Sequence, residues 1–460
     1  MELKKYKLGE ILDVTRGASL SGEFYATEGK YIRLTCGNFD YQNNCFKENK
    51  SKDNLYYIGD FKPEFLMEEG DIITPLTEQA IGLLGSTAII PESGKYIQSQ
   101  DVAKIICKEE LLDKDFAFYL ISSTLVKQQL SAAAQQTKIR HTSPDKIRDC
   151  TVWIPELTEQ KRIGKLLRSL DRKIELNRAI NQNLEAMAKQ LYDYWFVQFD
   201  FPNEEGKPYK SSGGKMVWNE KLKREIPEGW DISLIKDIAT TYSGGTPKST
   251  NIEYYDNGEI AWINSGELNS PIITKTTNYI TKCGLENSSA KLYPSNSILV
   301  AMYGATAGKV SLLTFEACSN QAVCGVIPTI ENMLYYVYFH ISSLYSHFIT
   351  LSTGSARDNI SQDTIKNILL PIPTRNILKL FDEKIGSIYQ TIVNNYQQID
   401  SLTKQRDELL PLLMNGQVSV NSDLLACILS YILISVYRNL GIISFAGNLP
   451  INTKTTISRL

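Results

Sequence analysis

Residues 158–195 read TEQKRIGKLLRSLDRKIELNRAINQNLEAMAKQLYDYW. The apolar residues of this stretch recur in alternating steps of three and four, which is the spacing of a coiled-coil helix. They are Ile163, Leu167, Leu170, Ile174, Leu184, Leu191 and Trp195. The spacing predicts one long helix with a narrow apolar seam that packs against a second helix.

Residues 376–414 repeat the same spacing. Their seam residues are Phe381, Ile385, Ile388, Ile392, Ile399, Leu402, Leu409 and Leu413. The offset is constant, because Phe381, Ile388 and Leu402 follow Ile163, Leu170 and Leu184 by 218 residues. Asn177 and Asn395 share this offset at inward positions, where a polar residue costs stability and fixes register. We therefore predict that the two helices pair, since two unrelated amphipathic core helices would not share an offset.

The composition is that of a soluble globular protein of two to four domains, with 460 residues, 43% hydrophobic and 22% charged. Eight cysteines show no C-x-x-C spacing, which favours free thiols in a reducing cytoplasm and gives no sign of zinc. No apolar signal segment follows the N-terminus. The net charge of −2 means that any contact with DNA must come from local basic patches.

The order of motifs in the first half starts again from about Ile232. Segments 7–12, 31–37 and 70–73 are echoed by 233–238, 260–266 and 296–299. The offset drifts in these globular parts and is fixed through the helices, which indicates a duplicated unit with diverged loops. Diverged loops on a fixed frame suggest two different targets that are bound in one way.

The duplication predicts an α+β chain with two mixed α/β domains in tandem, each followed by a long helix. The predicted segments are a first domain at 1–154, a helix at 155–199, a linker at 200–230, a second domain at 231–373, a helix at 374–416 and a tail at 417–460. The linker is rich in Gly, Pro, Ser and Lys. In the tail, the apolar run 424–437 falls short of the ~20 residues of a membrane span, so an extra packing helix is favoured over an anchor.

Sequence motifs of common catalytic sites are missing. The nearest run to a P-loop, Gly304–Val310, is one residue short and ends in valine where a hydroxyl should hold magnesium. There is no G-x-G-x-x-G opening a βαβ unit, and no N-P-P-[YF] run to hold a flipped base for methylation. With three histidines in all, we predict no catalytic residues, no metal site and no cofactor in this chain.

Two polar loops, one ahead of each long helix, carry residue types that bind duplex DNA through phosphates and base edges. The first has Lys138, Arg140 and His141, and the second has Ser355, Arg357 and Asn359. Their equivalent placement favours DNA contact over two solvated loops. Weaker candidates are Arg16, beside Gly17, and Lys248, after a Gly-Gly-Thr-Pro run, although a plain turn accounts for either glycine run alone.

Several of these motifs closely resemble those of specificity subunits of type I restriction-modification enzymes. The central ones are IPELTEQKRI at 154–163, LDRKIELN at 170–177 and WFVQFDFP at 195–202, followed by GKPYKSSGG at 206–214 and IPEGW at 226–230. SGGTP at 243–247, RDNIS at 357–361 and LPIP at 370–373 resemble the opening and the close of a target recognition domain. The resemblance covers roughly residues 1–420. The first half departs from it at Arg140 and His141, which stand where Asp358 and Asn359 stand in the second half.

The resemblance implies a subunit that is not catalytic by itself. Each target recognition domain would read one half of a split sequence in double-stranded DNA, and the paired helices would space the domains and dock two methyltransferase subunits. Restriction subunits that translocate DNA would complete the complex. S-adenosylmethionine, ATP and magnesium would bind to these partners, and no membrane would be involved.

The geometry of the helices supports this reading independently. A helix of ~38 residues is ~57 Å long, which exceeds the ~34 Å of one duplex turn. We prefer antiparallel pairing, which sets Asn181 beside Asn395, to parallel pairing, which sets Asn177 there. The alternatives are a coiled-coil scaffold or a DNA-binding protein without restriction-modification partners, and a stand-alone nuclease or methyltransferase, which the missing motifs disfavour.

Overall fold

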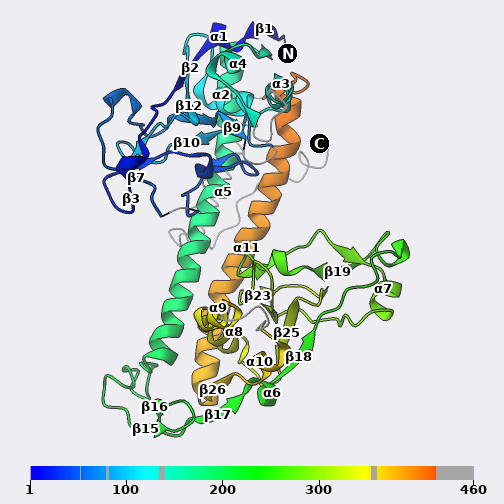
Figure 1. Cartoon of the computed structure of the whole chain (residues 1–460). Coiled ribbons are helices and arrows are strands. Elements are labelled where there is room, and N and C mark those ends of the chain that lie inside the picture. The colour runs from blue at the N-terminus through cyan, green and yellow to red at the C-terminus, as the bar shows by residue number, and fades with distance from the viewer. Residues whose placement is uncertain (1, 52, 79–81, 134–139, 354–359, 421–460) are drawn as a thin grey trace, which may run out of the picture. The chain divides into compact units, whose positions relative to one another are not determined.

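The computed structural model describes residues 2–51, 53–78, 82–133, 140–353 and 360–420. They form two compact units: unit 1 holds the described residues up to Glu175 and from Ser401 onward, and unit 2 spans Leu176–Asp400. The longest helices are α5 (Leu157–Tyr192) and α11 (Arg375–Met414), and each contributes residues to both units (Figure 1). A π-helical turn, η4 (Asp193–Val197), continues α5. The stretches of coiled-coil spacing at 158–195 and 376–414 therefore agree with α5 and α11 to within three residues at each end.

Unit 1 is built around a four-stranded sheet with the order β10-β8-β12-β2. All four residues of β8 are buried, as befits a strand that is covered on both faces. The sheet consists of β2 (Leu12–Arg16), β8 (Ile72–Pro75), β10 (Ala88–Ile89) and β12 (Val102–Cys107). A second sheet, of order β11-β4-β7-β3, consists of β3 (Tyr25–Ala26), β4 (Tyr31–Arg33), β7 (Tyr56–Tyr57) and β11 (Tyr96–Ile97).

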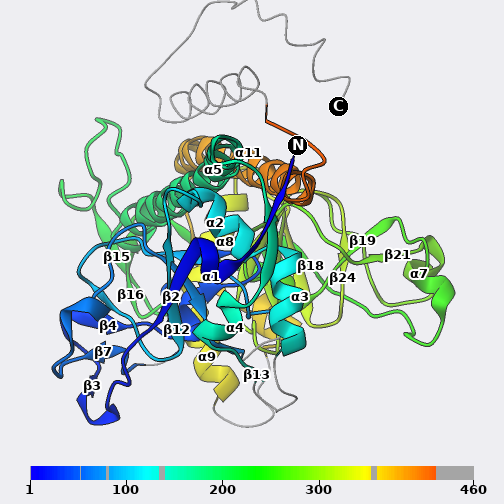
Figure 2. The same cartoon turned by 90° about the horizontal axis from the view of Figure 1, so that it is seen from above.

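Short strand pairs and helices complete unit 1. The strand pairs are β1 (Lys4–Lys7) with β14 (Thr151–Ile154), β5 (Phe39–Asp40) with β6 (Cys45–Phe46), and β9 (Thr77–Glu78) with β13 (Arg140–His141). The helices are α1 (Leu8–Ile11), α2 (Lys114–Ile121), α3 (Thr124–Ala133), α4 (Pro144–Arg148), and the 3-10 turns η1 (Gly22–Phe24), η2 (Cys36–Asn38) and η3 (Pro63–Phe65). Figure 2 shows α1 and α4 beside β2.

Unit 2 has a five-stranded sheet of order β18-β25-β22-β23-β20. It consists of β18 (Ala239–Ser243), β20 (Ile272–Ile273), β22 (Ser297–Ala301), β23 (Val310–Leu313) and β25 (Val323–Pro328). A smaller sheet of order β21-β19-β24 consists of β19 (Ile260–Ile263), β21 (Tyr279–Ile280) and β24 (Cys318–Ser319).

Two strand pairs and the helices complete unit 2. The pairs are β15 (Met216–Asn219) with β16 (Arg224–Pro227), and β17 (Asp231–Leu234) with β26 (Leu369–Ile372). The helices are α6 (Ile235–Ile238), α7 (Lys282–Glu286), α8 (Leu334–Ser343), α9 (Tyr345–Thr353), α10 (Gln362–Lys366), and the 3-10 turns η5 (Ile252–Tyr254) and η6 (Ser265–Glu267).

The two units share one topology. The order β10-β8-β12-β2 of unit 1 recurs as β23-β22-β25-β18 in unit 2, with β20 added at one edge. In each unit, the strand that leads into the central sheet pairs antiparallel with the strand that precedes a long helix, β1 with β14 and β17 with β26. The duplication seen in the sequence is therefore a duplication of the fold, and the chain contains two mixed α/β domains in tandem.

The segment 200–230, predicted to be a linker, contains ordered structure in unit 2. It holds the β15–β16 hairpin, and its aromatic rings pack against one another. Phe201 stacks on Tyr209 and on Trp230, with ring centroids 4.7 and 5.2 Å apart. These rings belong to the same apolar core as η4, so the segment folds onto unit 2.

His340 in α8 is held at both ring nitrogens within unit 2. Its Nε2 lies 3.2 Å from the carbonyl oxygen of Leu369, which can only accept, so Nε2 carries the proton. Its Nδ1 therefore accepts from the hydroxyl of Tyr192 at 3.2 Å. Burial lowers the pKa of His340 to about 4. This arrangement agrees with a packing role, which is the ordinary role of a histidine on an aromatic helix.

We expect His340 to make unit 2 sensitive to acid. Because the pKa is lowered on folding, the unfolded chain takes up a proton near pH 6.5 while the folded chain does so only near pH 4. The free energy of unfolding should fall by on the order of 3 kcal/mol as the pH drops through this window, and level off below it. Urea unfolding at several pH values measures this loss. His340→Gln should flatten the dependence, His347→Gln at an exposed position should not, and an equal slope in all three proteins would contradict the assignment.

Among the described residues, no helix combines the length and the apolar character that crossing a membrane requires. The apolar run 424–437 lies outside the described residues.

Candidate nucleic-acid interface

One edge of unit 1 gathers four segments that are distant in the sequence. Strand β9 pairs with β13, so that Thr77 lies opposite His141. The turn at 98–101 joins this pair, because the amide of Leu76 donates to the carbonyl of Asp101 at 2.8 Å. Arg16, at the end of β2, donates from Nε to the carbonyl of Gln100 at 2.8 Å. Two of the predicted DNA-binding residues, Arg16 and His141, therefore come from one connected edge.

Arg16 is exposed, and only its Nε is used in that bond. A guanidinium has five N–H donors, so the others remain available for a phosphate or a base. Gly17 next to it serves packing, because a Cβ there would lie 2.2 Å from the carbonyl oxygen of Gln98. The glycine thus lets the chain approach the 98–101 turn.

His141 is exposed at the end of β13 and is bound through one ring nitrogen. Its Nδ1 lies 3.3 Å from the hydroxyl of Thr77, and that hydroxyl donates to the carboxylate of Asp101 at 3.4 Å. Thr77 itself is buried. Burial, and then the charge of Asp101, raises the pKa of the neighbouring thiol of Cys36 to about 11, so this cysteine is unreactive at neutral pH.

Several predicted residues lie outside what the structure describes. Lys138 in the first half and Ser355, Arg357 and Asn359 in the second half lie outside the described residues. Arg140 lies in β13 opposite Glu78, and its side chain is likewise not described. Their role in binding stays a prediction.

Unit 2 builds an equivalent edge with different side chains. The hydroxyl of Thr246 donates to the Gln321 side chain, which lies in the turn that corresponds to 98–101. Gln362, at the start of α10, donates from Nε2 to the carbonyl of Thr241 at 2.8 Å and accepts from the hydroxyl of Ser243 at 3.1 Å. Lys248 is exposed just beyond Thr246. In its turn, this edge carries the amide of Gln321 where the repeated run of unit 1 carries the carboxylate of Asp101.

The glycines ahead of Lys248 also serve packing. A Cβ on Gly244 would lie 2.0 Å from the carbonyl oxygen of Asn320, and one on Gly245 would lie 2.3 Å from the amide nitrogen of Ala290. The carbonyl of Gly245 accepts from the indole of Trp262 at 2.9 Å. These contacts agree with the alternative that the glycine run is a plain turn. Of this segment, only Lys248 remains as a candidate for contact with DNA.

Sequence reasoning missed Thr77, Asp101, Gln321 and Gln362 as parts of these edges. The signal was present, because the repeated runs Ser99–Ala103 and Ser319–Val323 mark the same turn in both halves. What the sequence did not reveal is that the turn contacts Thr77, opposite His141, in unit 1 and Thr246, two residues before Lys248, in unit 2.

The predicted seam residues are mostly buried. Those buried are Ile163, Leu170, Ile174, Asn177, Phe381, Ile392 and Asn395, and those partly buried are Leu184, Ile388 and Leu402. Within unit 2, Asn395 donates from Nδ2 to Oδ1 of Asn181 at 2.8 Å. Asn177 donates to the Gln398 side chain at 3.2 Å in the same unit. The polar seam residues are thus engaged with residues of the other long helix.

Unit 1 contains a buried charged contact between the same two helices. Arg406 of α11 donates from Nη1 to Asp171 of α5 at 2.9 Å, and each side chain is 10% exposed. The hydroxyl of Tyr119 in α2 donates to the other oxygen of Asp171 at 2.5 Å. Burial, and then the charge of Asp171, raises the pKa of Tyr119 far above its usual value, so the phenol keeps its proton. Both oxygens of the buried carboxylate are therefore bonded.

No group of three or more potential metal ligands occurs among the residues that the structure describes. The described cysteines are free thiols. Burial raises the pKa of Cys318 and Cys324 to about 12, so these thiols carry no charge at neutral pH.

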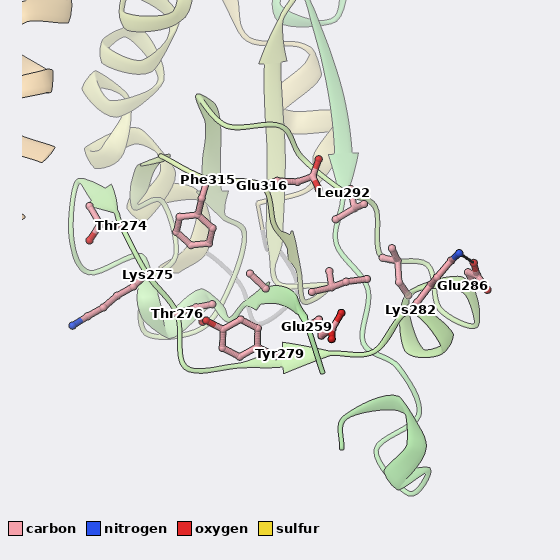
Figure 3. A pocket seen from close by; sticks show the side chains of 13 residues that line it. Glu259, Thr274, Lys275, Thr276, Tyr279, Lys282, Glu286, Leu292, Phe315 and Glu316 are labelled. Atoms are coloured by element: carbon pink, nitrogen blue, oxygen red, sulfur yellow. Dashed lines mark ion pairs between the residues drawn. The ribbon is translucent and has the colours of Figure 1, made fainter. Parts of the chain in front are cut away.

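A hollow of about 650 Å³ opens in unit 2 beside β19 and α7 (Figure 3). The charged residues that line it are Glu259, Lys275, Lys282, Glu286 and Glu316. Both lysines have carboxylate partners, because Lys275 binds Asp400 at 2.6 Å and Lys282 binds Glu286 at 3.8 Å. The remaining carboxylates would repel a phosphate, so this hollow does not suit a nucleic-acid backbone.

Comparisons with protein families and with known proteins point to the same class of protein. Residues 1–186 and 227–409 match the family described as "Type I restriction modification DNA specificity domain". The type I restriction enzyme MjaIX specificity subunit of Methanocaldococcus jannaschii is 25% identical over 326 residues, which are 70% of this chain and 73% of that protein. The type I restriction enzyme HindI specificity subunit of Haemophilus influenzae is 26% identical over 377 residues, or 71% and 81% of the two chains.

A solved structure shares the fold. The type I restriction-modification system S subunit from M. genitalium aligns with a TM-score of 0.58 at 15% sequence identity. The alignment covers 90% of this chain and 96% of that one.

Proposed function

Because the chain belongs to the family of type I restriction-modification DNA specificity domains, we propose that it reads a DNA sequence in two separate parts for a type I restriction-modification complex. Each of its two domains contacts one part in double-stranded DNA. The observation that carries this proposal is that one sheet topology occurs twice, with a polar turn in each copy that carries different side chains. A duplicated frame with exchanged contacts is what reading two unlike sequences requires.

The long helices act as the spacer between the two reading domains. With 36 and 40 residues, α5 and α11 extend for about 54 and about 60 Å at 1.5 Å per residue. These lengths exceed the ~34 Å of one duplex turn, so the two parts of the site fall on separate turns. A fixed spacer makes the distance between the two half-sites part of the recognised sequence.

The two helices pair as an antiparallel coiled coil in this proposal. Antiparallel pairing sets Asn181 beside Asn395, and the hydrogen bond between these side chains supports it. Asn177, which parallel pairing would set beside Asn395, binds Gln398 instead. Two inward asparagines fix the register of the seam, because any slip would leave both amides buried without partners.

The chain is not catalytic by itself in this proposal. Its partners are two methyltransferase subunits, which dock on the helices, and restriction subunits. S-adenosylmethionine, ATP and magnesium belong to those partners, and the chain itself has no cofactor. The complex acts in the cytoplasm, where the host DNA lies.

The proposed division of the chain follows the duplication. Residues 1–154 and 231–373 are the two target recognition domains, 155–199 and 374–416 are the spacer helices, and 200–230 joins the two halves. Residues 417–460 form an appended segment. Its part after Val420 lies outside the described residues.

Co-expression with a type I methyltransferase subunit, followed by mapping of methylated adenines in host DNA, tests the proposal. We expect a split motif that is methylated in both parts. Replacing residues 231–373 by the corresponding domain of another family member should change one part of the motif and leave the other part and the spacing intact. A stable complex whose methylation pattern ignores this exchange would contradict the proposal.

A further inference from the structure

The contacts of His141 determine which of its ring nitrogens carries a proton. The carboxylate of Asp101 can only accept, so the single hydroxyl proton of Thr77 points to Asp101 across 3.4 Å. The same hydroxyl oxygen can then only accept from the imidazole, whose Nδ1 lies 3.3 Å away. Nδ1 therefore carries the ring proton, and Nε2 of the neutral imidazole is an acceptor.

This acceptor is available to a ligand. His141 is exposed, and no other group in the described part of the chain bonds to its ring. Thr77 is buried, and the carbonyl of Asp101 accepts a hydrogen bond from the amide of Leu76. Thr77 and Asp101, which orient the ring, are therefore themselves held in place. The neutral ring therefore presents Nε2 to a ligand as a hydrogen-bond acceptor.

We propose that Nε2 of His141 in its neutral form accepts a hydrogen bond from the exocyclic amino group of a DNA base, with Thr77 and Asp101 as positioning residues that hold the ring proton on Nδ1. In the major groove the only such donors are N6 of adenine and N4 of cytosine. A neutral acceptor gains nothing from a phosphate oxygen, which is itself an acceptor. This inference rests on the proposed DNA-reading function and adds the chemical group that the first domain selects.

The test uses the full-length chain and functional-group deletion in DNA. The sequence preferred by the wild-type chain is first selected from a library of random duplexes. Each adenine of the first half-site is then replaced by purine, and each cytosine by 2-pyrimidinone, which removes the amino group alone. We expect one position at which this deletion weakens wild-type binding roughly 3- to 10-fold, as loss of one hydrogen bond should.

The protein variants identify the partner of that amino group. With Thr77→Val, which keeps the shape and removes the hydroxyl, and with His141→Ala, the same deletion should no longer change the affinity. Asp101→Asn, which removes the charge that holds the Thr77 proton, should reduce the sensitivity to the deletion. Thr142→Val is the matched control, because Thr142 follows His141 directly in the sequence. Its hydroxyl is buried and has no hydrogen-bond partner among the described residues.

The second half-site controls for folding, because residues 231–373 read it in the proposed function. Preference there should persist in every variant. If the Thr77→Val chain keeps full sensitivity at every amino group, the inference is overturned. If His141→Ala weakens binding to all duplexes equally, the histidine contacts a phosphate and the inference is again overturned. A wild-type chain that selects no sequence at all would overturn the proposed function, and the inference with it.

Discussion

Replacing Arg406 by alanine is expected to lower the free energy of unfolding of unit 1 by about 3–5 kcal/mol. Arg406 and Asp171 are each 10% exposed and lie 2.9 Å apart. Removing the guanidinium leaves the carboxylate buried with Tyr119 as its one remaining described hydrogen-bond partner. An uncompensated buried charge is among the few changes that cost this much. Urea unfolding, followed by a probe in unit 1, measures the loss.

Two comparisons give this prediction its controls. Lys404→Ala removes an exposed cation two residues earlier on α11, which pairs with Glu408 at 3.9 Å, and should change stability by less than about 1 kcal/mol. Asp171→Tyr combined with Arg406→Ala copies the residues found 218 positions away, Tyr389 and Ala188, and should recover most of the loss. Equal effects of Arg406→Ala and Lys404→Ala would show that the buried contact does not matter.

Replacing Ile392 by aspartate is expected to cost unit 2 at least about 4 kcal/mol. Ile392 is fully buried in the core that contains Phe381 and Tyr192. Its carbonyl also accepts from Nδ2 of Asn181 at 3.4 Å, so the change disturbs the polar pair beside it. In the proposed function, the same variant should lose the fixed spacing between the two parts of the DNA site.

The control for Ile392→Asp is Gln397→Asp, which places the same charge at an exposed position of α11. It should change stability by no more than ~0.5 kcal/mol. Ile392→Val, which removes one methylene, should cost about 0.5–1.5 kcal/mol. Circular dichroism and urea unfolding follow stability, and methylation mapping follows the spacing. Normal stability of Ile392→Asp would contradict the assignment of this residue to the core.

The long helices and the duplication could be predicted because their signal is periodic and extended. The seam repeats every three or four residues through both helices, and one constant offset aligns Ile163 with Phe381 and Asn177 with Asn395. The repeated segments 31–37 and 70–73 include residues of β4 and β8, each a short β-branched or aromatic run between turn residues. Local pattern suffices for such elements.

What the sequence could not reveal depends on contacts between distant residues. Segment 200–230 has no helical period, yet Phe201, Tyr209 and Trp230 stack on one another and fold it onto unit 2. Asp171 lies in a helix that the periodicity predicts, but its partner Arg406 lies 235 residues away. The contacts of the candidate edge could not be predicted for the same reason, because nothing near Thr77 in the sequence indicates that it contacts Asp101 and His141.

The contact between Asp171 and Arg406 makes the two halves of this duplicated protein unequal. At the matching positions of unit 2, Tyr389 packs against Tyr335 and Tyr338, and Ala188 stands in the place of the arginine. A chain assembled from two first halves would bury Asp171 opposite alanine, and one assembled from two second halves would bury Arg406 without a carboxylate. The duplication produced two similar halves, but recombination between them is constrained. The target recognition domains can be exchanged freely only if the crossovers leave each long helix with its original partner helix.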